Sequence, residues 1–136
     1  MIRAVIDTNV LVSGLLSASG NEALTILAIH QELVTPCFSA EIIEEYAAVL
    51  ARRKFSFPPE QIAAHAMLER VGERFNPVDF SVSSPDPADS KFLHCAMVAE
   101  ADFIVTGNRR DFPDSPYGRT RVVSAGELLD WITLGT

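Results

Sequence analysis

The chain has 136 residues, of which 48% are hydrophobic, and its formal net charge is −7. This length and hydrophobic content predict a single packed domain over residues 1–136 and argue against wholesale disorder. The acidic balance argues against binding nucleic acid through a generally basic surface, unless bound metal ions cover some of the acids.

No apolar run approaches the roughly 20 residues of a membrane helix. The N-terminal segment has neither the apolar length nor the cleavage site of a signal peptide. We therefore expect a cytoplasmic protein with no membrane segment. The two cysteines, Cys37 and Cys95, are expected to be small buried residues, because no cysteine or histidine spacing resembles a zinc site.

Strand and helix patterns alternate in the first half of the chain. The predicted elements are a strand at residues 2–6, helices at 10–16 and 23–31, a strand at 33–35, and helices at 39–50 and 60–75. Pro36 is expected to end the second strand. Ser39 is a typical N-cap residue, and Pro59 is a typical first residue of a helix.

The second half continues the alternation. Its predicted elements are a strand at 78–82, a helix at 88–100, a strand at 102–106, a turn or short helix at 108–112, a strand at 121–123 and a last helix after residue 124. No hairpin turn sequence separates the apolar runs. Alternating strands and helices without hairpins predict a parallel sheet with helices on both faces.

Four acidic residues, Asp7, Glu45, Asp89 and Asp111, are placed by these elements near one end of the predicted sheet. Asp7 and Asn108 each follow a strand, and Glu45 and Asp89 are expected in the first turns of helices. Parallel sheets carry their sites at the carboxyl ends of the strands. A carboxylate cluster with few cations nearby is typical of a divalent metal site, and hard oxygen ligands suit Mg²⁺ or Mn²⁺.

Single acids also have simpler interpretations. Asp86 is better explained as a turn or N-cap residue, and Asp89 and Asp111 have the same alternative. Other catalytic patterns are missing from the sequence: it has no Gly-rich nucleotide loop and no Gly-x-Ser-x-Gly motif. Asp7-Thr8-Asn9 lacks the second acid of an aspartate-nucleophile phosphatase.

Four segments in order resemble the PIN-domain ribonucleases, in particular the toxins of VapBC-type toxin–antitoxin systems. The segments are residues 5–13, residues 39–50, residues 86–93 and residues 101–112. In these segments Asp7, Glu45 and Asp89 match the acidic site residues of the family. Asn108 departs from the Asp that many relatives carry, and Asp111 is the next available acid. The matching accessory polar residues are Thr8, Asn9, Ser13 and Thr106.

The resemblance implies a PIN-like three-layer α/β/α sandwich with a central parallel sheet of four to five strands. It implies an endoribonuclease that hydrolyses RNA phosphodiesters with Mg²⁺ or Mn²⁺. Asp7, Glu45, Asp89 and Asp111 would be catalytic, and the same acids with Asn108 would be metal ligands. The family also implies the toxin role of a type II toxin–antitoxin system and a homodimer. An antitoxin helix would lie in a groove between the predicted helices at 23–31, 39–50 and 59–75.

Two other functions remain open from the sequence. One is a non-catalytic PIN-like domain that binds RNA or a protein, and the other is a phosphatase of small molecules. The sequence does not name the RNA target, the number of metals, or which of Asn108 and Asp111 supplies the fourth ligand.

Overall fold

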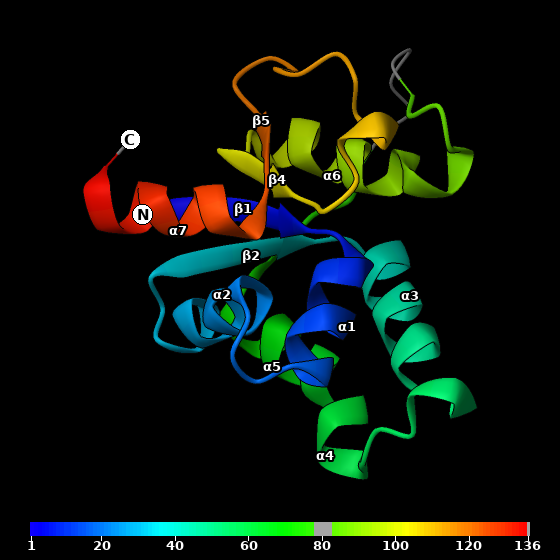
Figure 1. Ribbon diagram of the computed structural model, residues 1–136. Helices are drawn as coiled ribbons and strands as arrows, with labels where there is room; N and C mark the ends of the chain where they lie inside the picture. Colours follow the sequence, from blue (N-terminus) through cyan, green and yellow to red (C-terminus); the bar gives the residue numbers. More distant parts are fainter. Residues whose placement is uncertain (78–82, 136) are drawn as a thin grey trace.

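The computed structural model describes residues 1–77 and 83–135. Five parallel strands form one sheet in the order β3-β2-β1-β4-β5 (Figure 1). The strands are β1 (Ile2–Ile6), β2 (Val34–Phe38), β3 (Glu73–Arg74), β4 (Phe103–Val105) and β5 (Arg121–Val123). The predicted central parallel sheet is confirmed. β2 and β3 are added on one side of β1, and β4 and β5 are added on its other side, so the switch point of the sheet lies between β1 and β4.

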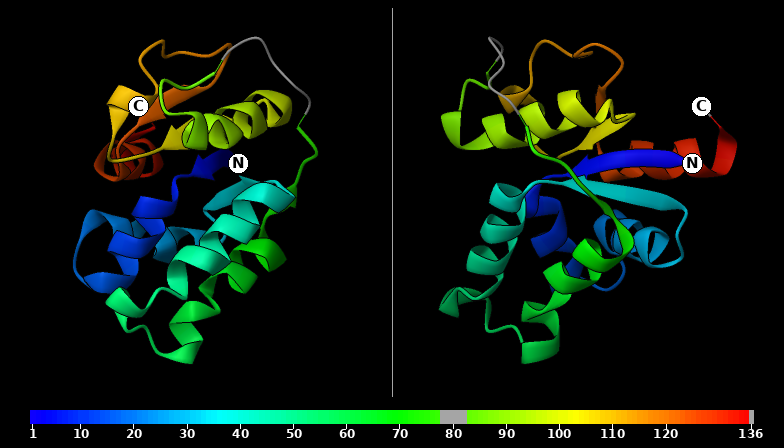
Figure 2. Two further views of the ribbon diagram at one scale, coloured as in Figure 1. Left: turned by 90° about the vertical axis from the view of Figure 1, so that its right-hand side faces the viewer. Right: turned by 180° about the vertical axis from the view of Figure 1, so that it is seen from behind.

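Helices cover both faces of the sheet, so the predicted α/β/α sandwich is confirmed. The α-helices are α1 (Thr8–Leu16), α2 (Asn21–His30), α3 (Ala40–Leu50), α4 (Pro59–Ile62), α5 (Ala64–Val71), α6 (Ser90–Ala99) and α7 (Ala125–Leu134). Figure 2 shows α1 to α5 on one side of the sheet and α6 on the other. Three short 3-10 helices connect these elements: η1 (Arg53–Phe55), η2 (Pro87–Asp89) and η3 (Arg109–Asp111).

The core is centred on β1. Ala4, Val5 and Ile6 are almost completely buried, because α6 packs against β1 and α1 to α5 lie on the other side of the sheet (Figure 2). A strand buried on both faces reads as a continuous apolar run, which is what the sequence shows here. Tyr46 of α3 is also buried, and its hydroxyl donates a hydrogen bond to the carbonyl oxygen of Ile6 at 2.5 Å.

The prediction that Pro36 ends the second strand is wrong, since β2 continues to Phe38. Proline costs a strand one backbone donor, and it is tolerated where a strand lacks a neighbour on one side. β3 pairs with Cys37 and Phe38, so within the described residues β1 is the only strand that pairs with Pro36.

The predicted single helix at 60–75 is also wrong. The chain forms α4, breaks at Ala63, forms α5 and then enters β3. Gly72 makes the change from helix to strand possible, because a Cβ atom there would lie 2.3 Å from the carbonyl oxygen of Pro36. The strand predicted at 78–82 lies outside the described residues.

Cys37 and Cys95 are buried free thiols, as expected. Burial raises the pKa of Cys37 to about 11 and that of Cys95 to about 12. Within the described residues, no single helix is long and apolar enough to cross a membrane. Helices α1 and α2 pass that test only as a pair, and the chain bends by 103° between them.

Candidate metal centre

Asp7 lies at the carboxyl end of β1 and is only 4% exposed. One carboxylate oxygen accepts a hydrogen bond from the Thr106 hydroxyl at 2.7 Å, and the other accepts from the backbone N–H of Asn9 at 3.3 Å. Burial raises the pKa of Asp7, and the negative charges of Glu45 and Asp111 raise it further, while the two hydrogen bonds oppose this rise. Among the described residues, no cation forms an ion pair with this carboxylate.

Three further carboxylates gather at the same edge of the sheet. Oxygens of Asp86, Asp89 and Asp111 lie within 4.8 Å of one another. Asp89 ends η2 and Asp111 ends η3, so two short 3-10 turns deliver the pair. Asp86 also caps η2, where its carboxylate accepts from the backbone N–H of Ala88 at 3.0 Å. The interpretation of Asp86 as a cap is therefore correct, but the residue belongs to the acid cluster as well.

The environment of Asp89 shows how strongly these charges oppose one another. Burial, a side-chain hydrogen bond with Asp111 and the charges of Asp7, Asp111 and Asp86 raise the pKa of Asp89 to about 7. A carboxyl group with such a pKa holds its proton until near neutral pH unless a cation replaces it. The cluster therefore has the charge and the hard oxygen atoms that a divalent cation requires.

Asn108 has a supporting position next to this cluster. Its side-chain amide donates a hydrogen bond to the Asp111 carboxylate at 2.7 Å. Its own backbone N–H donates to the Thr106 hydroxyl at 3.0 Å, so Thr106 links Asn108 to Asp7. The Ser84 hydroxyl donates to the Asp111 carbonyl oxygen at 2.5 Å. In this arrangement the amide of Asn108 orients the Asp111 carboxylate, and Asp111 is the better placed of the two to be a ligand.

Glu45 reaches the site differently from the other acids. It lies in the second turn of α3, so the expectation of a first-turn position is wrong. One of its oxygens accepts a hydrogen bond from the Thr8 hydroxyl, and the other forms an ion pair with Lys91 Nζ at 2.7 Å. Both oxygens are therefore engaged, and the role of Glu45 as a metal ligand stays a prediction.

Sequence reasoning missed Lys91 as a site residue. The Lys91 ammonium also donates to the backbone carbonyl of Ala88, in the turn that carries Asp89. Its position two residues after a candidate ligand was the available signal, but a lysine on a predicted helix is usually a surface charge. Here its side chain is 13% exposed, so it supplies a largely buried positive charge between Glu45 and the turn of Asp89.

Asp86, Asp89 and Asp111 are the residues that would hold a divalent cation, with Asp7 beside them. When bound, such a cation would neutralise charge on a phosphodiester and activate water. The protein's own contribution is to hold the acids in place: Thr106 holds Asp7, Asn108 holds Asp111, and Thr8 and Lys91 hold Glu45.

The fold and the site together define an α/β protein with an acid cluster at the switch point of a parallel sheet. Residues 3–110 match a family model described as the PIN domain, and the chain belongs to this family. PIN domains are generally nucleases and typically use divalent metals. A comparison with curated proteins found no match.

Proposed function

We propose that this protein is an endoribonuclease that hydrolyses RNA phosphodiesters with Mg²⁺ or Mn²⁺. The observation that carries the proposal is the convergence of Asp86, Asp89 and Asp111 beside the buried Asp7. Four carboxylates in one place repel one another, and a divalent cation removes that repulsion while presenting positive charge to a phosphate.

The direct test is cleavage of a mixed, unstructured RNA with and without Mn²⁺. We expect cleavage only with the metal, and we expect Asp89→Asn to lose most of it. Asp114→Asn is the matched control, because it makes the same change of charge at an exposed position three residues after Asp111. Equal rates for the two variants would contradict the proposed site.

The same purified protein also distinguishes the ribonuclease from the two alternative functions. A non-catalytic PIN-like domain would bind the RNA and leave it intact at saturating Mn²⁺. A phosphatase of small molecules would hydrolyse a chromogenic phosphomonoester and not RNA. We expect neither result, because the family is generally one of nucleases and the acid cluster suits metal-dependent phosphodiester chemistry.

We also propose that the protein is the toxin of a type II toxin–antitoxin pair, forms a homodimer and acts in the cytoplasm. Support comes from the resemblance of the four sequence segments to toxins of this kind. Partner binding needs apolar surface, and Leu24 and Leu27 of α2 are 45% and 46% exposed. They line a hollow with α7 rather than with α3 or α5, so the surface on α2 lies outside the expected groove.

Co-purification with the product of a neighbouring small gene tests the antitoxin. The mass of the protein alone in solution, measured by light scattering, tests the homodimer. A complex at micromolar concentration that suppresses RNA cleavage is the expected result. A monomer that binds no such product would contradict both partner proposals and would leave the ribonuclease proposal standing.

A further inference from the structure

Several basic residues near the acid cluster have no carboxylate partner. The chain has 11 lysine and arginine residues, and those that form ion pairs within the described residues are Arg3, Arg74, Lys91, Arg109 and Arg119. The others include Arg52, Arg53 and Lys54, three consecutive exposed residues after α3 that we call the basic turn. Arg110 of η3 is exposed as well. On a protein with a net charge of −7, these residues form local positive surfaces.

The order of the strands places Asp7 between these two basic positions. Helix α3 follows β2, Asp7 follows β1, and η3 follows β4. Because β1 lies between β2 and β4, Asp7 lies between α3 and η3 at the carboxyl edge of the sheet. Figure 1 shows α3 extending away from this edge on one side of the sheet, with the short helix near residue 110 on the other side. The basic turn and Arg110 therefore flank the acid cluster.

The basic turn is close enough to contact an RNA strand that is bound at the acid cluster. Glu45, in the middle of α3, accepts a hydrogen bond from Thr8, the residue after Asp7. Arg52 follows Glu45 by seven residues, which is roughly 10 Å along a helix that rises about 1.5 Å per residue. A few nucleotides of a single strand span this distance, at about 3.4 Å each.

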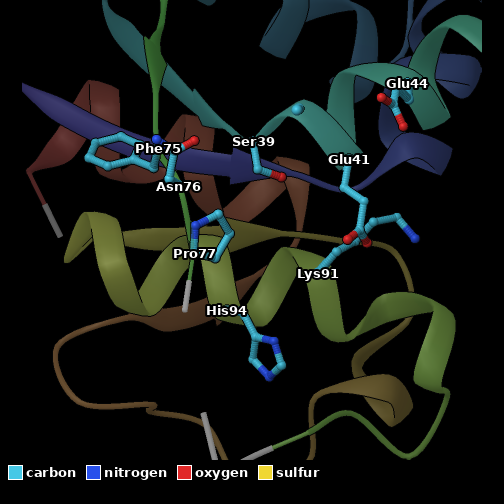
Figure 3. A pocket seen from close by; sticks show the side chains of 9 residues that line it. Ser39, Glu41, Glu44, Phe75, Asn76, Pro77, Lys91 and His94 are labelled. Atoms are coloured by element: carbon cyan, nitrogen blue, oxygen red, sulfur yellow. The ribbon is translucent and has the colours of Figure 1, made fainter. Parts of the chain in front are cut away.

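The charge on α3 changes along its length. Glu41 and Glu44 line a hollow of about 350 Å³ beside the first half of the helix (Figure 3), where Lys91 is already paired with Glu45. The two glutamates repel a phosphate, and the basic turn beyond the end of the helix attracts one. A strand of RNA that leaves the acid cluster along α3 is therefore drawn past the hollow to the basic turn.

Two aromatic rings hold the basic turn in shape. Phe55 stacks on Phe57 with ring centroids 5.4 Å apart, and Phe57 is buried in the core. Lys54 Nζ lies 5.1 Å from the centroid of the Phe55 ring. A binding surface that is already held in one conformation loses less entropy when its partner binds.

We propose that the basic turn and Arg110 bind phosphates of the RNA strand on the two sides of the phosphodiester that is cleaved. The inference rests on the proposed ribonuclease function and adds the path that the substrate takes across the protein. Arginine suits this task, because its guanidinium group can donate two parallel hydrogen bonds to one phosphate.

The salt dependence of RNA binding tests this path. Fluorescence anisotropy measures the affinity for labelled oligo(U) at several KCl concentrations and constant Mn²⁺, in the Asp89→Asn background so that the RNA stays intact. Each lost phosphate contact lowers the slope of log affinity against log salt by about 0.7 for a single strand. We therefore expect Arg52→Gln/Arg53→Gln to lower the slope by about 1.4 and Arg110→Gln to lower it by about 0.7.

The matched control is Arg119→Gln/Arg121→Gln. It makes the same change of net charge as the arginine pair of the basic turn, at exposed residues beside the start of β5 and therefore at the opposite edge of the sheet. The control should keep the slope of the unsubstituted basic residues. Thermal melting shows that each variant is folded before the slopes are compared.

Four results would overturn the inference. They are no detectable binding of oligo(U) at low salt, an unchanged slope in Arg52→Gln/Arg53→Gln, an unchanged slope in Arg110→Gln, and an equal loss of slope in the control. The second result together with a lower Tm would show that the basic turn only stabilises the negative end of α3.

The measurement does not depend on cleavage, so the inference and the ribonuclease proposal fail separately. A wild type that binds RNA through these residues and cuts none would contradict the ribonuclease and support the binding path. If the wild type does cleave RNA, Arg52→Gln/Arg53→Gln should raise KM and leave kcat nearly unchanged, because the lost contacts lie away from the reacting bond. An equal fall in kcat and kcat/KM would overturn the assignment of the basic turn to substrate binding.

Discussion

At the scale of single residues, Asn108 and Asp111 act as a unit. The amide of Asn108 donates to one oxygen of Asp111 at 2.7 Å and leaves the other oxygen of that carboxylate free of this bond. The structure therefore favours Asp111 over Asn108 as the fourth ligand. Asp111 carries the charge, and Asn108 fixes its orientation.

Asp111→Asn should reduce RNA cleavage more than Asn108→Ala. Removing a charged ligand weakens metal affinity more than removing a group that orients it, and the loss of an orienting group typically costs about 10- to 100-fold in metal affinity. The measurement is cleavage rate against Mn²⁺ concentration for both variants. If Asn108→Ala is the more damaging change, and Asn108→Asp raises activity, then Asn108 is the ligand from this loop.

The raised pKa values of Asp7 and Asp89 predict how stability depends on pH without metal. The folded protein holds these protons more tightly than the unfolded chain, whose carboxyl pKa is near 3.8. Between that value and about 7, the folded state binds more protons, so the free energy of unfolding should fall as the pH rises.

Urea unfolding in a chelator at several pH values measures this dependence. Asp89→Asn should flatten it, because the asparagine has no proton to lose, and Asp114→Asn should leave its slope unchanged. If the free energy of unfolding of the wild type rises from pH 4 to 7, groups other than Asp7 and Asp89 control its pH dependence, and the prediction is wrong.

At the scale of elements, the site depends on how α3 is fixed to the end of β1. Ser39 caps α3 by accepting a hydrogen bond from the backbone N–H of Ile42 at 3.3 Å. One turn further along, Tyr46 bonds to the Ile6 carbonyl, directly before Asp7. Glu45 precedes Tyr46, so the same contact sets the distance from Glu45 to the other acids.

Tyr46→Phe should lower the free energy of unfolding by about 1–3 kcal/mol, because it leaves the buried Ile6 carbonyl without this partner. Tyr117→Phe is the control: its hydroxyl accepts from the backbone N–H of Asp114 at 3.1 Å, away from α3. Both variants are compared by urea unfolding and by RNA cleavage at saturating Mn²⁺. Only Tyr46→Phe should also slow RNA cleavage. Equal cleavage rates for Tyr46→Phe and Tyr117→Phe would show that the hydrogen bond between Tyr46 and Ile6 does not position the site.

At the scale of the whole molecule, the sheet is what brings the acids together. β1 pairs with β4, so Thr106, which follows β4, reaches Asp7, which follows β1. The turns before α6 and after β4 then add Asp89 and Asp111. The folded chain thus holds several carboxylates in one place, whereas the unfolded chain keeps them apart.

Mg²⁺ or Mn²⁺ should therefore stabilise the folded state as a whole. A cation that binds only the folded protein adds about 2.7 kcal/mol at one hundred times its dissociation constant, which corresponds to a rise of several degrees in Tm. Asp7→Asn should lose much of this rise and should melt at a higher temperature than the wild type when metal is absent. A Tm that does not change across millimolar metal would contradict the cation site.

The sequence by itself determined the features that depend on neighbouring residues. The apolar run before Asp7, the cap at Ser39 and the alternation of strands with helices were enough to predict a parallel sheet with helices on both faces and to place Asp7, Asp89 and Asp111 near one end of it. They did not indicate that Asp86, which was explained as a turn or cap residue, lies within 4.8 Å of Asp89 and Asp111. Local periodicity and capping preferences act over a few residues, so they can be read without knowing the fold.

Only the tertiary structure decided the rest. Pro36 stays in β2 because β3 is short, and the predicted long helix ends at Gly72 because the chain must pass close to Pro36 there. The pairing of Lys91 with Glu45 joins residues 46 positions apart, and the pKa of Asp89 near 7 comes from burial and from charges on separate loops. Desolvation and charge repulsion depend on distances in space, and those distances exist only once the sheet has formed.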